Sequence, residues 1–297
     1  MDRRTLITSL AAASLAAPGE AYTRAGRLAL APRTYRYAET PGVDPDLQSL
    51  DLYGAPGQGR PILAFIHGGG WRIGDKANPP AGADKARVFT ERGYLYASLN
   101  YRLSPAVRHP AHIEDVAAAI AWLFANAKAQ GGDPSRIVVM GHSAGAHLAA
   151  LVAADPRWLG AHGLKPRDLK GAILLDGAGY DVATQAKALI ARGGFMGDMY
   201  GDAFGRDGAL WRDASPVFQL DPARPPPPFL IFHTQRPDAT RQSRLLAEAV
   251  RKAGGAASVA PAFDKTHASI NNDIGAPGDK PTTAIFDALR RWGAAPA

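Results

Sequence analysis

The hydrophobic pattern alternates between two kinds of segment along most of the chain. Short runs rich in apolar residues, typical of strands covered on both faces, occur at 61–66, 94–99, 136–140, 171–175, 229–232 and 257–260. Between them lie segments with helix-favouring or helically spaced apolar residues, including 84–91, 112–129, 148–153, 241–252 and 281–292. This alternation predicts an α/β fold with a mostly parallel central sheet and helices on both faces.

Two stretches depart from this rhythm. Near the N-terminus, residues 35–37 and 50–53 alternate apolar and polar positions, which predicts half-buried strands at the edge of the sheet. Residues 180–228 mix aromatic residues with glycines and end in four consecutive prolines, so they are expected to form an insertion and a candidate lid. No internal repeat or linker divides the rest, and residues 22–297 are therefore expected to be a single domain.

The first 21 residues have the pattern of an export signal. Arg3 and Arg4 precede a short apolar stretch and a series of small residues suited to cleavage between Ala16 and Ala21. The paired arginines resemble the twin-arginine type of signal. The apolar part is much shorter than the ~20 residues that span a bilayer. We therefore expect a periplasmic or secreted protein with no stable membrane insertion.

Composition narrows the classes of function only slightly. The formal net charge is +7, from 34 Lys and Arg against 27 Asp and Glu, but the basic residues are scattered and form no run typical of nucleic-acid binding. We therefore expect no nucleic-acid partner. Cysteine is absent, which excludes disulfides, thiol catalysis and cysteine metal sites.

Two glycine-rich motifs follow predicted strands. The first, His-Gly-Gly-Gly-Trp at 67–71, ends an apolar strand, and its glycines allow backbone N–H groups to approach a ligand closely. The second, Gly-His-Ser-Ala-Gly at 141–145, lies between an apolar run and a helix-favouring run, so Ser143 is expected in a sharp, strained turn with its hydroxyl exposed. In a parallel sheet both motifs lie at the carboxyl ends of strands, where ligands bind.

These motifs and their order resemble the α/β-hydrolase fold, particularly its hormone-sensitive-lipase-like and carboxylesterase branch. The resemblance covers about 50–292. It implies a serine esterase that acts through an acyl-enzyme and needs neither a metal nor an organic cofactor. It also implies that the nucleophile, acid and histidine follow one another in this order along the chain.

The resemblance implies Ser143 as the nucleophile and a later histidine as the general base. His267 follows the last predicted strand, in a segment that resembles the loop carrying the family's base. His162 lies in a surface-like segment and His233 ends a strand, so neither is preferred. Structural roles are expected for the histidines in or beside the two motifs, which are His67, His142 and His147.

The acid is the least defined member of this triad. The family usually places it just after the strand that ends at Phe232, and there Asp238 is the one available carboxylate, so Asp238 is the predicted acid. The glycine-rich turn that usually precedes the acid is missing, and Gln235 falls where relatives carry an acid. Asp176, directly after the preceding strand, is the alternative, and Asp181 is a third choice. If Asp238 is not the acid, its expected role is to cap the following helix.

The remaining candidates would contact the substrate. The backbone N–H groups of Gly69, Gly70 and Ala144 are implied as donors to the oxyanion that forms during acyl transfer. Trp71 and Trp211 are candidate substrate-binding side chains, the latter because it belongs to the aromatic insertion.

Two other functions fit parts of the pattern. The motif at 67–71 and the segment 236–244 also resemble kynurenine formamidases, although the export signal disfavours a cytosolic substrate. A non-catalytic ligand-binding protein on the same fold is a further alternative, which an intact Ser143 and His267 disfavour. The preferred substrate is a small or carbohydrate-linked ester, and the sequence specifies neither its acyl group, its alcohol nor an oligomeric state.

Overall fold

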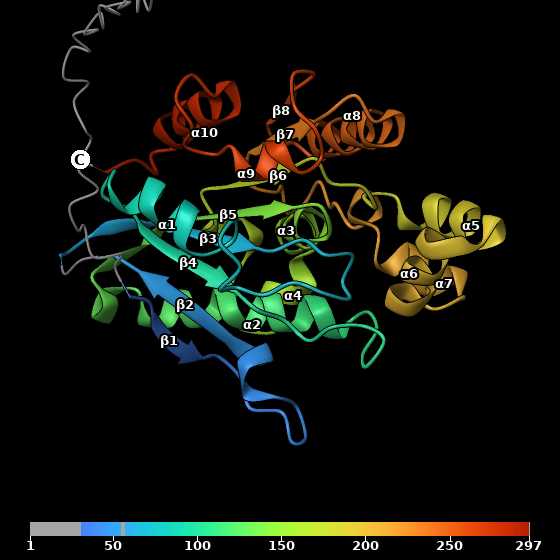
Figure 1. The fold of residues 1–297 in the computed structure, drawn as a ribbon, viewed down its shortest axis with the longest axis horizontal. Coiled ribbons are helices and arrows are strands. Elements are labelled where there is room, and N and C mark those ends of the chain that lie inside the picture. The colour runs from blue at the N-terminus through green and yellow to red at the C-terminus, as the bar shows by residue number, and fades with distance from the viewer. Residues whose placement is uncertain (1–30, 55–56, 297) are drawn as a thin grey trace, which may run out of the picture.

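The computed structural model describes residues 31–54 and 57–296, and the predicted signal at 1–21 lies outside them. Within the described residues, eight strands form one sheet in the order β1-β2-β4-β3-β5-β6-β7-β8 (Figure 1). The pairs β1–β2 and β2–β4 are antiparallel and the others are parallel, which confirms the predicted α/β fold. The strands are β1 Arg33–Arg36, β2 Ser49–Tyr53, β3 Arg60–Ile66, β4 Leu95–Leu99, β5 Gly132–His142, β6 Gly171–Leu175, β7 Phe229–His233 and β8 Ala257–Pro261.

Helices cover both faces of the sheet, with α1 and α10 on one side and α2 on the other (Figure 1). None of the described helices is both long and apolar enough to cross a membrane. The α-helices are α1 Ala83–Thr90, α2 Ala111–Asn126, α3 Ala144–Ala154, α4 Pro156–Gly160, α5 Val182–Arg192, α6 Gly194–Phe204, α7 Gly208–Asp213, α8 Pro237–Lys252, α9 Ser269–Asn272 and α10 Lys280–Arg291. The short 3-10 helices are η1 Pro45–Gln48, η2 Lys128–Gln130, η3 Pro166–Asp168 and η4 Pro216–Phe218.

The core has two parts, one on each face of the sheet. Along β3, Ile62, Ala64 and Ile66 belong to the part that includes α2, α3 and α8, whereas Leu63 and Phe65 belong to the part that includes α1 and α10. Successive side chains of a strand point to opposite faces, so a strand covered on both sides must be apolar throughout. This explains why the sequence shows unbroken apolar runs here.

The insertion between β6 and β7 folds as the helices α5, α6, α7 and η4, which lie beyond the carboxyl ends of the central strands (Figure 1). Its aromatic residues Tyr200 and Phe204 pack inward, whereas Phe195 and Phe218 are exposed. Tyr200 and Phe204 of α6 meet the ring of Trp71 edge-on, with centroid separations of 5.3 and 4.7 Å. The predicted break in the strand–helix rhythm is therefore a helical layer that is anchored on the core.

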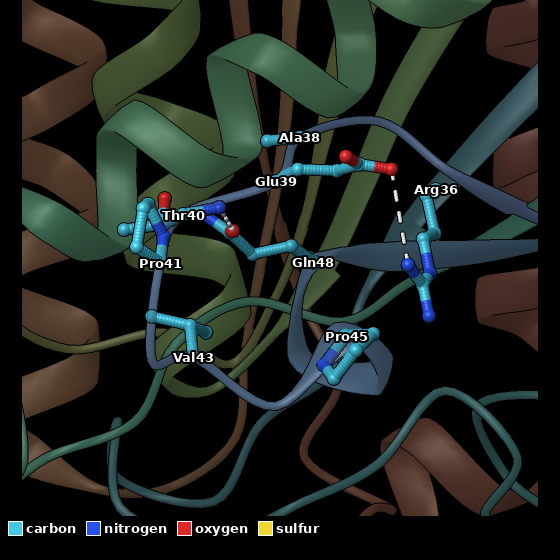
Figure 2. Close-up of a pocket in the computed structure, with 8 residues that line it drawn as sticks. All are labelled: Arg36, Ala38, Glu39, Thr40, Pro41, Val43, Pro45 and Gln48. Carbon is cyan, nitrogen blue, oxygen red and sulfur yellow. Dashed lines mark hydrogen bonds and ion pairs between the residues drawn. The ribbon is translucent and has the colours of Figure 1, made fainter.

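The connection from β1 to β2 forms a separate hollow of about 280 Å³, shown in Figure 2. There the side chain of Gln48 accepts a hydrogen bond from the backbone of Thr40 at 2.9 Å and donates one to Asp115 of α2 at 2.8 Å. These bonds attach the edge of the sheet to α2. The residues that line this hollow all lie within 36–48, far along the chain from the two glycine-rich motifs.

Candidate active site

Ser143 lies in the turn between β5 and α3 with φ 54° and ψ −117°. This conformation is strained for a residue other than glycine, and such strain concentrates at functional sites. The turn also needs a glycine at 145, because a Cβ atom there would collide with the carbonyl oxygens of Ile66 and His67. The predicted sharp turn between a strand and a helix is thus present, with Ser143 at its tip.

His267 lies in the loop between β8 and α9, and its imidazole bridges two groups. Its Nε2 is 3.0 Å from Oγ of Ser143, and its Nδ1 is 2.6 Å from Oδ2 of Asp176. An ionised carboxylate can only accept a hydrogen bond, so Nδ1 carries the proton and Nε2 presents its lone pair to the serine hydroxyl. This is the geometry that a general base requires.

Asp176 directly follows β6 and its side chain is fully buried. It has φ 46°, a second strained position in the site. The carboxylate also accepts hydrogen bonds from the backbone N–H and the hydroxyl of Thr234, at 2.9 and 3.1 Å. Burial raises the pKa of Asp176, but the bonds from His267 and Thr234 and the charge of Arg236 outweigh it, so the pKa falls below its ordinary value. The carboxylate is therefore ionised near neutral pH.

The prediction that Asp238 partners His267 is wrong. Asp238 lies in the first turn of α8, where its carboxylate is 3.3 Å from Nε2 of Gln185 and 3.6 Å from Nη2 of Arg236. The chain enters α8 at Pro237, which leaves only 234–236 after β7 and commits Asp238 to the helix. The alternative acid, Asp176, occupies the position beside His267.

The third candidate acid has a purely local role. Asp181 is the N-cap of α5, and its side chain accepts a hydrogen bond from the backbone N–H of Thr184 at 2.9 Å. Such a cap satisfies one of the unpaired N–H groups at the start of a helix.

The histidines on either side of Ser143 hold neighbouring segments in place. Burial lowers the pKa of both His142 and His147 to about 3, so both rings are neutral. His142 donates from Nε2 to the backbone carbonyl of His267 at 2.8 Å. His147 donates from Nε2 to the carbonyl of Ala214 at 2.8 Å and accepts from Nε1 of Trp71 at 3.2 Å. His142 thus holds the loop that carries His267, and His147 holds the insertion between β6 and β7.

Three other histidines, His162, His233 and His67, have the structural or surface positions expected from the sequence. His162 is exposed on the surface. His233 is buried and its Nδ1 lies 2.9 Å from the carbonyl of Thr234. Burial lowers the pKa of His67, whose neutral ring donates from Nδ1 to the carbonyl of Gly68 at 2.7 Å. His67 thus shapes the glycine loop rather than carrying protons.

The predicted oxyanion donors lie around the nucleophile. A Cβ atom on Gly68 would be 3.2 Å from Cβ of Ser143, so the glycine loop packs directly against the turn. Across the part of the chain that the structure describes, no residue accepts a hydrogen bond from the N–H groups of Gly69, Gly70 or Ala144. Ala144 is the first residue of α3, where a helix leaves its N–H groups unpaired. These groups are available to an oxyanion.

Of the two predicted tryptophans, Trp71 has no free face for a substrate. Trp71 is 2% exposed and packed in the core, and Trp211 is half-buried with Nε1 donating to the carbonyl of Gly205 at 3.0 Å. Met199 of α6 contacts the glycine loop at Gly70, because a Cβ atom on Gly70 would collide with its sulfur. Nothing in the sequence pattern distinguishes Met199 from the other apolar residues of the insertion.

Sequence reasoning missed Arg236 as a member of the site. Its Nη1 is 3.0 Å from Nδ1 of His267 and its Nε is 3.7 Å from Oδ2 of Asp176. The position just after β7, where the resemblance places the acid, was the one available signal.

A family model described as BD-FAE matches residues 50–250, more than half of the chain. The chain belongs to the BD-FAE family. This membership and the observed sheet confirm the resemblance to α/β-hydrolase esterases.

Individual relatives of this BD-FAE protein point the same way. Esterase LipQ of Mycobacterium tuberculosis is 35% identical over 212 residues, which is 68% of this chain and 48% of LipQ. Kynurenine formamidase of Meyerozyma guilliermondii is 37% identical over 113 residues, 35% of this chain and 38% of the relative. The chain thus spans about half the length of LipQ and a smaller share of the kynurenine formamidase. The crystal structure of esterase B from Lactobacillus rhamnosis shares the fold, with a TM-score of 0.69, 24% identity and coverage of 90% and 86% of the two chains.

Proposed function

We propose that this BD-FAE protein is a serine esterase that cleaves carboxylic esters through an acyl-enzyme. The observation that carries the proposal is the continuous line from Oγ of Ser143 through the imidazole of His267 to the buried carboxylate of Asp176, with contacts of 3.0 and 2.6 Å. The names of the relatives, an esterase foremost, support the same chemistry.

Each residue of this line has one task in acyl transfer. Ser143 attacks the ester carbonyl while Nε2 of His267 takes its proton and then gives it to the leaving alcohol. Asp176 holds the imidazole in the required tautomer and stabilises its positive charge. The N–H groups of Gly69, Gly70 and Ala144 bind the oxyanion, and the loss of one such donor typically lowers the rate by about 10²–10³. Water then releases the acid by the same steps in reverse.

The test is a panel of small esters that includes acetylated and feruloylated sugars, the proposed substrate class. The wild-type protein should hydrolyse a short-chain p-nitrophenyl ester and react with a fluorophosphonate probe, whereas Ser143→Ala should do neither. His162→Ala, which changes an exposed histidine, is the matched control and should retain both activities. Hydrolysis that persists in Ser143→Ala would contradict the proposal, and a folded wild-type protein inert to ester and probe would favour a ligand-binding role.

Formamide hydrolysis is the second candidate, because kynurenine formamidase is among the relatives and its likeness covers part of the chain. The same catalytic line would serve, since the leaving group alone differs. An assay of N-formylkynurenine beside the ester panel ranks the two. A higher kcat/KM for the formamide than for every ester would reverse our ranking.

We also propose that the protein is exported, on the evidence of Arg3, Arg4 and the short apolar stretch that follows. Fractionation of the native host should recover a shortened protein outside the cytoplasm. A full-length cytosolic product would refute this.

A further inference from the structure

Arg236 brings a positive charge into the centre of the site. Its guanidinium lies between two carboxylates, with Nε 3.7 Å from Oδ2 of Asp176 and Nη2 3.6 Å from Oδ2 of Asp238. Its Nη1 is 3.0 Å from Nδ1 of His267. The side chain is one-third exposed, so solvent screens this charge only in part.

The contact between Arg236 and His267 is not an ordinary hydrogen bond. Nδ1 of His267 donates its proton to Asp176, and it has no lone pair left to accept one from the guanidinium. Two N–H groups therefore face each other at 3.0 Å. Arg236 attracts the carboxylate of Asp176 but repels the positive charge that His267 acquires when it takes a proton.

The other groups that face this pair divide into neutral and charged ones. His142 is neutral beside His267, with ring centroids 4.7 Å apart, and burial keeps the phenols of Tyr180 and Tyr200 neutral by raising their pKa values. Asp264 and Lys265 line the open hollow of about 490 Å³ beside Arg236 and His267. Lys265 is held by Asp273 and Asp279 at 2.8 and 2.7 Å. Among the residues that the structure describes, Arg236 is thus the cation in direct contact with the imidazole.

We infer that Arg236 is a positioning residue that keeps Asp176 ionised and in place while it disfavours the protonated form of His267. In this way it favours the neutral imidazole, the form that accepts the serine proton. Asp238 holds the guanidinium from the other side. This inference rests on the proposed serine hydrolase mechanism and adds a residue to it.

The experiment is the pH profile of kcat/KM on a short-chain p-nitrophenyl ester for wild type, Arg236→Gln and Arg236→Lys. The acidic limb of such a profile reports protonation of the free enzyme's base. In Arg236→Gln the acidic limb should move to higher pH by about one unit. This size is expected because the repulsion between the guanidinium and the protonated imidazole acts at close range but is partly screened by solvent. Arg236→Lys keeps the charge and should leave the limb within about 0.3 unit of wild type.

Two further variants test the direction of the shift and the effect of losing a positive charge elsewhere on the protein. Asp238→Asn removes a negative charge from the same cluster, so its limb should move slightly in the opposite direction, to lower pH. Arg244→Gln changes an exposed arginine of α8 and is the matched control for loss of one positive charge, with no movement of the limb. An acidic limb that stays in place in Arg236→Gln, or that moves equally in Arg236→Lys and Arg236→Gln, would overturn the inference.

A second readout separates this inference from the proposed function. The pH dependence of fluorophosphonate labelling of Ser143 requires His267 but no ester substrate. If wild type is labelled yet hydrolyses none of the esters, the substrate class is wrong, and the shift of the labelling profile in Arg236→Gln still decides the role of Arg236. If Arg236→Gln does not fold, Arg236→Met, which keeps the apolar stem and lacks the charge, is measured in its place. Failure of both uncharged variants to fold, while Arg236→Lys folds with a wild-type profile, would overturn the tuning role in favour of a structural one.

Discussion

At the scale of single residues, Ser143 and Asp176 occupy strained backbone positions, as does Trp71 of the glycine-rich motif, with φ 59°. Ser143 and Asp176 both have a positive φ although neither is a glycine. Each residue directly follows a strand, and the side chain of each contacts His267. Strain of this kind costs on the order of 1–3 kcal/mol per residue and persists only where the surroundings enforce it.

The first prediction compares the two candidate acids, Asp176 and Asp238. Asp176→Asn should lower kcat by about 10⁴, because an amide supports the wrong tautomer of His267. Asp238→Asn should change kcat by about twofold at most, since it removes a partly exposed ion pair. Steady-state kinetics with circular dichroism to check the fold would measure both. A larger loss in Asp238→Asn than in Asp176→Asn would restore the assignment that the sequence favoured.

The sequence pattern singles out Ser143 and His267 but ranks Asp238 above Asp176 as the acid, and the reason is physical. The first two are marked by local patterns: a turn that only small neighbours permit, and a histidine just after the last strand. Whether an aspartate serves as the acid depends on where the fold places its carboxylate. Asp176 and Asp238 both follow neighbouring strands, and only the entry of the chain into α8 at Pro237 decides between them.

At the scale of elements, the insertion between β6 and β7 is both anchored and close to the site. Trp71, His147, Tyr200 and Phe204 form a buried cluster that joins the glycine loop, α3 and α6. The pattern of the sequence identified the insertion because it broke the alternation of strands and helices. It did not reveal which apolar residues face the core, because glycine-rich helices such as α6 carry little periodicity.

The second prediction compares two residues of this layer. Met199→Ala should open space next to Gly70 and raise kcat/KM for longer acyl chains relative to acetate by about tenfold, the typical effect of a few methylene groups in a pocket. Trp211→Ala should instead lower the melting temperature and leave the preference unchanged, because Trp211 packs against the core. Rates on a series of p-nitrophenyl esters and thermal unfolding curves would decide. Altered selectivity in Trp211→Ala alone would reverse this assignment.

At the scale of the whole molecule, Lys85 joins α1 to the segment that follows His267. It is 1% exposed, and its Nζ donates to the carbonyl of Pro80 and to both oxygens of Asn271, at 2.7 Å for the backbone and 2.8 Å for the side chain. Burial lowers the pKa of Lys85 to about 7. No acidic side chain is among the partners that accept its hydrogen bonds in the described residues.

The third prediction follows from this depressed pKa. Between pH 7 and the ordinary lysine value near 10.4 the unfolded chain binds the proton and the folded protein does not, so stability increases as pH rises through this window. The free energy of unfolding should thus increase by about 2 kcal/mol from pH 7 to pH 9 through this residue. Urea unfolding at both pH values should show the gain in wild type relative to Lys85→Met. Equal pH dependence in the two proteins would contradict it.

The hydrogen bond from the backbone of Ser143 to the carbonyl of Leu175 has a consequence for behaviour on heating. Leu175 immediately precedes Asp176, so Ser143 and Asp176 lie at the ends of the neighbouring strands β5 and β6. His267, by contrast, lies in a loop after β8. Loops open at lower free energy than sheet cores. Gradual warming should therefore separate the imidazole from two partners that stay in register, and cooling should restore the turnover. Any ester hydrolysis would then be lost reversibly at a temperature below the melting point, which the loop that carries His267 determines.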